Sequence, residues 1–121
     1  MKVTIIGGGS TYTPELIEGF IQIADQVNLR EIWMVDIPES KRKFDTVFGF
    51  ARRMVAKSGK NIKLEQTFDA NDAIKEANYI IFQFRPGLMQ GRIHDEKIPL
   101  EYGLIGQETT GMGGMACALR A

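Results

Sequence analysis

The residues whose types and spacing could bind a phosphate follow the opening strand. The apolar run Val3–Ile6 leads directly into the segment Gly7–Thr11, which holds three glycines and two hydroxyl groups. A glycine can turn the chain tightly and lets the backbone approach a pyrophosphate, because no Cβ stands in the way. The N–H groups and positive end of a following helix would then face the phosphates. The predicted cofactor-binding residues of this turn are Gly7, Gly9, Ser10 and Thr11.

This glycine turn matches the dinucleotide fingerprint G-x-G-x-x-G only in part. Tyr12 stands where the third glycine is expected, so the following helix should sit differently against the strand. Thr13 and Pro14 are suited to begin that helix, with Thr13 as the cap. An ordinary tight turn remains the alternative to a phosphate site.

An acidic residue ends the second predicted strand. Asp36 closes the apolar run that begins at Glu31, at the position where a carboxylate accepts hydrogen bonds from the adenosine ribose. We therefore interpret Asp36 as a ribose ligand that favours NAD over NADP, and a turn aspartate before a helix is the alternative. The segment Lys41–Lys43 is predicted to be a solvated basic face, and it would oppose that preference if it contacted a phosphate.

A second group of candidates follows the fourth predicted strand. Gln83 and Arg85 leave that strand at its carboxyl end, where ligands of open α/β sheets bind, and we predict that both bind the cofactor. Arg92 could hold a phosphate through two parallel bonds, with a solvated helix arginine as the alternative. Glu108 could hold a sugar hydroxyl or orient a nicotinamide, or it could be a surface glutamate. The glycines in 103–114 indicate a backbone close to a ligand.

These candidates need a scaffold of alternating strands and helices. Strands are predicted at 3–6, 31–36, 61–67 and 79–82, with helices at 13–27, 39–58 and 69–76 between them. The order βαβαβαβ with nearly continuous apolar strands predicts an α/β fold. The expected architecture is a Rossmann-type, doubly wound parallel sheet with right-handed crossovers and helices on both faces.

Composition narrows the class of protein. The chain has 121 residues, enough for one domain, with 15 basic and 15 acidic side chains that cancel. This balance does not favour a nucleic-acid or anionic-membrane partner. We expect a cytoplasmic protein, because no apolar run reaches the roughly 20 residues of a membrane span. One cysteine and one histidine exclude an internal disulfide and a Cys/His zinc cluster.

Several longer motifs resemble the NAD-dependent family 4 glycoside hydrolases over the whole chain, closest to the 6-phospho-β-glucosidase branch. The Gly-Gln-Glu-Thr block is far more specific than the glycine turn. The segments that carry the resemblance are 6–15, Asp36-Ile37-Pro38-Glu39, Gln83-Phe84-Arg85, 95–100 and Gly106-Gln107-Glu108-Thr109.

The resemblance implies a glycosidase that departs from the two-carboxylate mechanism. NAD would oxidise the sugar at C3, a tyrosine would remove the C2 proton, the aglycone would leave, water would add and the ketone would be reduced. A divalent metal, usually manganese, would polarise the sugar oxygens. Of the residues here, Arg92 would bind the 6-phosphate of a phosphorylated glucoside, and Glu108 would lie between cofactor and sugar.

The resemblance also implies a longer protein. Family members extend well beyond 121 residues, and their base and metal ligands lie later in the chain. We therefore expect residues 1–121 to be the NAD-binding portion of an enzyme that is a homo-oligomer when full length, and to be inactive alone, with no catalytic or metal residue. A 2-hydroxy-acid dehydrogenase of the lactate or malate type and a non-catalytic nucleotide-sensing module remain as alternatives.

Overall fold

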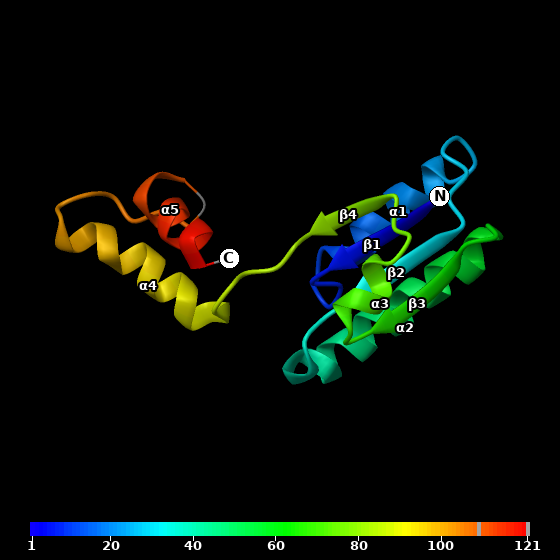
Figure 1. The fold of residues 1–121 in the computed structure, drawn as a ribbon, viewed down its shortest axis with the longest axis horizontal. Helices are drawn as coiled ribbons and strands as arrows, with labels where there is room; N and C mark the ends of the chain where they lie inside the picture. Colours follow the sequence, from blue (N-terminus) through cyan, green and yellow to red (C-terminus); the bar gives the residue numbers. More distant parts are fainter. Residues whose placement is uncertain (109, 121) are drawn as a thin grey trace. The chain divides into compact units, whose positions relative to one another are not determined.

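The computed structural model describes residues 1–108 and 110–120 (Figure 1). The chain divides into two compact units, the first spanning Met1–Phe84 and the second beginning at Arg85. The two units are described separately below.

The first unit is built on a four-stranded parallel sheet. Its strands are β1 (Lys2–Ile6), β2 (Glu31–Val35), β3 (Lys63–Thr67) and β4 (Tyr79–Phe82), in the spatial order β3-β2-β1-β4 (Figure 1). In register, Thr4 lies between Trp33 of β2 and Ile80 of β4. The parallel sheet and its order confirm the predicted Rossmann-type arrangement. Strand β1 lies inside the sheet, and after β3 the chain crosses back to add β4 on the other side of β1.

Helices connect the strands. They are α1 (Thr13–Ile23), α2 (Lys41–Ser58), preceded by a 3-10 turn at Pro38–Ser40, and α3 (Ala70–Ile74). Helices α1 and α2 pack against each other over a core that includes Val3, Ile5 and Phe44. On the opposite side of β1, the Thr4 hydroxyl donates to the carbonyl of Ala73 in α3 at 2.7 Å. Because alternate residues of a strand face opposite sides, these contacts place helices on both faces of the sheet.

Some local boundaries differ from the predictions. Helix α1 ends at Ile23 rather than continuing to Val27, and a turn follows in which Asn28 has a positive φ of 50°. Thr13 does not cap α1: it is the first helical residue, and its hydroxyl donates to the carbonyl of Gly8 at 2.8 Å. A buried hydroxyl satisfies its donor with the nearest free acceptor, and here that acceptor belongs to the glycine turn.

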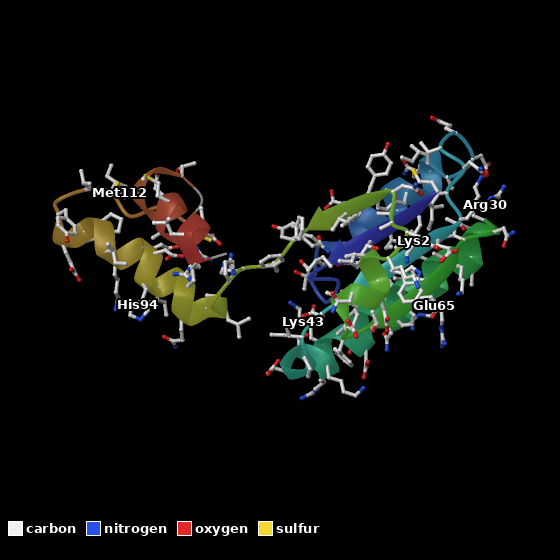
Figure 2. The ribbon with its side chains drawn as sticks, in the orientation of Figure 1. Lys2, Arg30, Lys43, Glu65, His94 and Met112 are labelled. Atoms are coloured by element: carbon white, nitrogen blue, oxygen red, sulfur yellow. The ribbon has the colours of Figure 1, made fainter. Side chains whose placement is uncertain are left out.

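The second unit is a pair of helices, α4 (Leu88–Glu101) and α5 (Gly111–Arg120) (Figure 1). The buried residues of α4 are Gly91, Asp95 and Pro99, four residues apart on one helical face. His94 is exposed on another face of α4 (Figure 2).

Two glycines of this unit, Gly106 and Gly113, lie close to its own backbone. The approach of this glycine-rich segment to a ligand stays a prediction. A Cβ added to Gly106 would collide with the Glu96 carbonyl of α4, and one added to Gly113 would collide with the Gln107 carbonyl. Glycine is needed at both positions because Gly106 lies against α4 and Gly113 lies against the backbone of Gln107. Within the described residues, no helix combines the length and the apolar character needed to cross a membrane.

Candidate functional site

The glycine turn is held against the end of β2 by backbone hydrogen bonds. The N–H groups of Gly7 and Gly8 both donate to the Val35 carbonyl, at 2.9 and 2.8 Å. The chain then folds back on itself, since the Ser10 N–H donates to the Gly7 carbonyl at 3.0 Å. Gly7 has a φ of +89°, a conformation that favours glycine. The turn is therefore a fixed loop that leads from β1 into the start of α1.

Asp36 fastens this turn to the β2–α2 connection. Its Oδ2 accepts a hydrogen bond from the Gly9 N–H at 2.7 Å, while its Oδ1 accepts from the Ile37 N–H at 2.8 Å and the Ser40 hydroxyl at 2.6 Å. A Cβ on Gly9 would lie 2.5 Å from Oδ2, so a side chain there would push the carboxylate away. A carboxylate offers about four acceptor positions, so Oδ2 keeps one for a ribose hydroxyl.

The Thr13 hydroxyl, which we expected to cap the helix, links the glycine turn to β4. The Gln83 side-chain amide donates to the Thr13 hydroxyl at 2.5 Å, and that hydroxyl donates to the Gly8 carbonyl. The backbone N–H of Gln83 also donates to the Ile6 carbonyl at 2.9 Å, which extends the hydrogen bonding between β4 and β1. Gln83 therefore joins the end of β4 to the glycine turn. A threonine just after a glycine turn, with a glutamine at the end of the adjacent strand, is the signal that could have identified this link.

The arrangement of the first unit fits a dinucleotide. Tyr12, at the N-cap of α1, makes no side-chain capping bond, so its side chain does not compete for the helix N–H donors. The half-buried Ser10 and the exposed Thr11 place hydroxyl groups at the same helix end. Helix N–H donors with adjacent hydroxyls suit a pyrophosphate, and the remaining acceptor position of Asp36 suits a ribose. These are the contacts that NAD requires of a mononucleotide-binding half.

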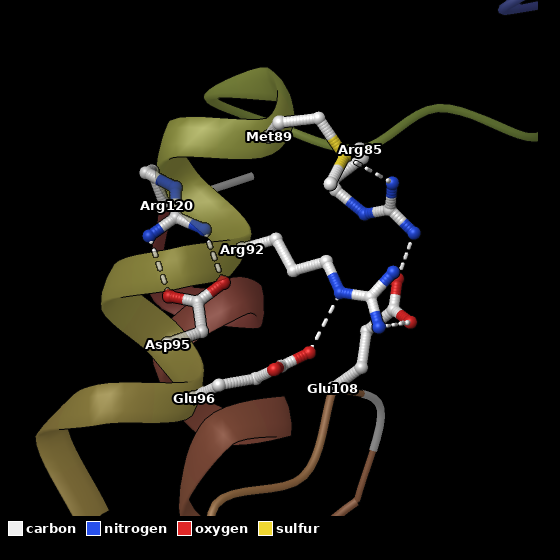
Figure 3. Close-up of polar contacts among 7 residues, drawn as sticks. All are labelled: Arg85, Met89, Arg92, Asp95, Glu96, Glu108 and Arg120. Atoms are coloured by element: carbon white, nitrogen blue, oxygen red, sulfur yellow. Dashed lines mark hydrogen bonds and ion pairs between the residues drawn. The ribbon is translucent and has the colours of Figure 1, made fainter.

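The second unit holds a cluster of two arginines and two glutamates, which we call the arginine–glutamate cluster: Arg85, Arg92, Glu96 and Glu108 (Figure 3). Glu108 pairs with Arg85 through Oε1 and with Arg92 Nη2 through Oε2 at 3.3 Å. The Arg92 Nε donates to Glu96 Oε1 at 2.6 Å, one turn along α4. Arg85, which the sequence grouped with the cofactor ligands, therefore lies in one cluster with Arg92 and Glu108.

A separate ion pair, Asp95–Arg120, joins α4 to α5. The Arg120 guanidinium donates to both carboxylate oxygens of Asp95, with Nη1 at 2.6 Å from Oδ1, and its Nε donates to the Pro86 carbonyl at 3.2 Å (Figure 3). Asp95 is only 2% exposed. The Arg120 hydrogen bonds hold the pKa of Asp95 below its ordinary value of 3.8, although burial acts in the opposite direction. Sequence reasoning missed this pair because its partners are far apart in the chain.

From the Asp95–Arg120 pair we predict that the stability of the helical unit decreases in acid. The folded-state pKa of Asp95 is lowered, so its contribution to stability is complete above the ordinary value of 3.8 and disappears as the pH falls through the folded-state value. Asp95→Asn should lower the unfolding temperature at pH 7 and show a smaller difference from the wild type near pH 2.5. Thermal unfolding followed by circular dichroism measures this difference, with Glu101→Gln on the same helix as the control. A difference that does not shrink in acid would contradict this role.

The candidate residues therefore form two groups, each within one unit. Gly7, Gly9, Ser10, Thr11, Asp36 and Gln83 surround the glycine turn, and Arg85, Arg92 and Glu108 belong to the arginine–glutamate cluster. Among residues 1–108 and 110–120, no three His, Cys, Asp or Glu side chains lie together as ligands for a metal ion. A hollow of about 240 Å³ between the segments 24–30 and 60–62 precedes β2 and β3, whereas ligands of such sheets bind at the carboxyl ends of strands.

Comparison with known proteins identifies the family. Residues 2–121 match the model of the family 4 glycosyl hydrolases, which is nearly the whole chain. The chain belongs to glycosyl hydrolase family 4. The resemblance inferred from the Gly-Gln-Glu-Thr block is thereby confirmed.

Individual relatives within family 4 include a probable 6-phospho-beta-glucosidase of Bacillus subtilis, 52% identical over 120 residues, or 99% of this chain and 27% of that protein. A 6-phospho-beta glucosidase structure from Thermotoga maritima, solved with NAD and glucose-6-phosphate, aligns with a TM-score of 0.88 and 47% identity over 100% of this chain. A 6-phospho-alpha-glucosidase from gut microorganisms, solved with NAD and Mn2+, aligns over 98% of this chain with a TM-score of 0.83 and 33% identity.

The chain is short beside these family members. It spans 27% of the Bacillus subtilis protein and 28% of the Thermotoga maritima chain.

Proposed function

We propose that residues 1–121 are the NAD-binding portion of an NAD- and divalent-metal-dependent 6-phospho-β-glucosidase. The observation that carries this proposal is the similarity, over the full chain, to a Thermotoga maritima enzyme solved with NAD and glucose-6-phosphate. Membership of a hydrolase family favours this reaction over the dehydrogenase alternative. The higher identity to β-specific relatives, 52% and 47% against 33% for an α-specific enzyme, supports the β anomer.

The residues of the first unit would hold the cofactor. The glycine turn would place backbone donors and the hydroxyls of Ser10 and Thr11 against the pyrophosphate. Asp36 would accept hydrogen bonds from the adenosine ribose through Oδ2, which already receives the Gly9 N–H and has one acceptor position left. Gln83 would keep the end of β4 fixed against the turn through Thr13.

Bound NAD would accept a hydride from C3 of the sugar and return it after elimination and hydration, with manganese as the proposed divalent metal. The task of this chain in that reaction is to orient the cofactor and hold the phosphorylated end of the sugar. Arg92 would bind the 6-phosphate, because a guanidinium donates two parallel bonds to phosphate oxygens. Glu108, in contact with Arg92, would lie near the sugar.

NAD and sugar phosphates are charged and do not cross a bilayer unaided. We therefore include a cytoplasmic location in the proposal. We also propose that the complete enzyme is a homo-oligomer, and sedimentation of the complete protein would measure its oligomeric state.

The decisive test is an assay of the complete enzyme with p-nitrophenyl β-glucoside 6-phosphate. We expect nitrophenol release that requires both NAD and Mn²⁺, and little release from the unphosphorylated glucoside or from the α anomer. Removal of the metal with a chelator should abolish turnover, and added Mn²⁺ should restore it. Oxidation of a 2-hydroxy acid with net NADH formation, without nitrophenol release, would support the dehydrogenase alternative instead.

A further inference from the structure

The peptide group between Gly8 and Gly9 is held at both of its polar ends. The Gly8 carbonyl accepts a hydrogen bond from the Thr13 hydroxyl at 2.8 Å, and the Gly9 N–H donates to Asp36 Oδ2 at 2.7 Å. A peptide group is planar, so its C=O and its N–H keep a fixed direction relative to each other. The contact that fixes the Gly8 carbonyl therefore also fixes the N–H that meets Asp36.

The Thr13 hydroxyl is itself held by the end of β4. It accepts a hydrogen bond from the Gln83 amide at 2.5 Å, and its own single proton is donated to the Gly8 carbonyl. Thr13 is 0% exposed, so water does not compete for these contacts. Hydrogen bonds that follow one another in this way strengthen each other. A continuous path of contacts thus runs from Gln83, at the end of β4, to the carboxylate that ends β2.

Packing beneath the turn leaves the peptide group little room to rotate. A Cβ on Gly8 would lie 2.8 Å from the Met34 Cβ and 3.2 Å from the Phe44 ring. A Cβ on Gly9 would lie 3.3 Å from the Phe44 backbone. Both glycines therefore rest directly on the core, which is packed too closely for the peptide to adopt a second orientation freely.

The other oxygen of the Asp36 carboxylate is fixed by a hydroxyl that could have served a helix. Ser40 stands at the N-cap of α2 and makes no side-chain capping bond, although serine is well suited to that role. Its hydroxyl instead donates to Asp36 Oδ1 at 2.6 Å. Thr13, at the start of α1, is likewise directed to the Gly8 carbonyl. Local preferences of this kind are set aside chiefly at functional sites, and here both hydroxyls determine the orientation of Asp36.

We infer that Thr13 is a positioning residue that sets the Asp36 carboxylate through the Gly8–Gly9 peptide, and that it thereby determines how strongly the complete enzyme prefers NAD over NADP. This inference rests on the proposed function, because it takes Asp36 as the ligand of the adenosine ribose. A carboxylate held in place accepts hydrogen bonds from the ribose of NAD and repels the 2′-phosphate of NADP. A carboxylate that can turn aside does both less well.

The test measures the ratio of NAD to NADP affinity of the complete enzyme by calorimetry. Thr13→Val removes the hydroxyl and keeps the branched side chain, and the ratio should fall by about fivefold to tenfold. The two cofactors share the same pyrophosphate, so a general loosening of the glycine turn would weaken both and leave the ratio unchanged. Thr13→Ser keeps the hydroxyl and should hold the ratio within about twofold of the wild type. An unchanged ratio in Thr13→Val would overturn the inference.

Two further comparisons separate positioning from a structural role. In an Asp36→Ala background, Thr13→Val should change the ratio by less than about twofold, because the group that it positions is absent. Thr46→Val removes an exposed hydroxyl that donates within α2 to the Arg42 carbonyl, so it makes the same chemical change away from the turn and should leave the ratio unchanged. Equal effects of Thr13→Val with and without Asp36 would contradict the inference.

A second variant keeps the inference testable if Thr13→Val does not fold. Thr13→Val leaves the Gly8 carbonyl and the Gln83 amide without this partner, which lowers stability. Gln83→Met keeps an unbranched side chain and the Thr13 hydroxyl but removes the donor that holds Thr13, so the ratio should fall by about threefold. A ratio equal to that of the wild type in a folded Gln83→Met variant would overturn the inference.

Failure of the inference and failure of the proposed function give different results. A wild-type enzyme that hydrolyses the phosphoglucoside, with a Thr13→Val variant of unchanged cofactor ratio, would overturn the inference alone. A wild-type enzyme whose preference for NAD depends on Thr13, but which hydrolyses no phosphoglucoside, would support the inference and overturn the function. A wild-type enzyme with no preference for NAD over NADP would overturn the inference directly.

Discussion

Replacing Gly7 by alanine is expected to lower the free energy of unfolding by about 3 kcal/mol, from backbone strain and overpacking together. Gly7 has a φ of +89°, which an L side chain rarely adopts. Its added Cβ would also lie 2.5 Å from the Gln83 carbonyl oxygen and 3.1 Å from the Phe84 Cβ. Relief of that contact requires β4 to move away from the turn, so NAD affinity should fall as well. Urea unfolding followed by circular dichroism measures the loss of stability.

Two other glycines separate the causes of this effect. Gly59 has a φ of +69° with open space around it. Gly59→Ala should therefore lower the free energy of unfolding by about 1 kcal/mol, from backbone strain alone. Gly19 lies within α1 with open space and no positive φ, and Gly19→Ala should stabilise the chain by up to about 1 kcal/mol. If Gly7→Ala lowered the free energy of unfolding no more than Gly59→Ala does, that result would contradict the close approach of β4 to the glycine turn.

Asp36→Ala is expected to weaken NAD binding by about 10- to 100-fold, the range for loss of hydrogen bonds to a charged group. The substitution removes the proposed ribose ligand and the acceptor that holds the Gly9 N–H at 2.7 Å. It also frees the Ser40 hydroxyl at the start of α2. Because a carboxylate repels a 2′-phosphate, the preference for NAD over NADP should shrink in the same variant. Calorimetric titration of the complete enzyme with both cofactors measures the two effects.

Further variants distinguish the ribose contact from a general loss of structure. Asp36→Asn keeps a neutral acceptor, so it should retain more NAD affinity than Asp36→Ala while losing much of the discrimination against NADP. Glu39→Ala removes an exposed acid from the same connection and should leave both affinities within about twofold. Unchanged NAD binding in Asp36→Ala, or tighter NADP binding by the wild type, would show that the ribose site lies elsewhere.

Much of the fold could be predicted because its signals are local. The apolar runs of β1, β2 and β4 and the intervening helical periodicity indicate a parallel sheet, and right-handed crossovers then restrict the strand order. The observed order β3-β2-β1-β4 agrees with that reasoning. The predicted end of α1 was wrong, because apolar residues continue at helical spacing to Val27 while the helix stops at Ile23.

The candidate site was only partly readable from the sequence. Gly7, Gly9 and Asp36 could be selected because each lies at the end of a recognisable strand, and the structure brings Gly9 and Asp36 into direct contact. The role of Thr13 could not be predicted from its neighbours. Its position beside Pro14 fits a helix cap, but the hydroxyl instead connects the Gly8 carbonyl with Gln83, 70 residues away.

The amino-acid sequence by itself determined the order of elements, the glycine turn and the family, because patterns of apolar side chains and short motifs act over a few residues. Only the tertiary structure decided which charged groups pair. Arg85 reaches Glu108 across 23 residues and Arg120 reaches Asp95 across 25, and Gly106 lies against α4 between them in the chain. A guanidinium can pair with any nearby carboxylate, so its partner depends on how distant segments pack, which local sequence patterns do not specify.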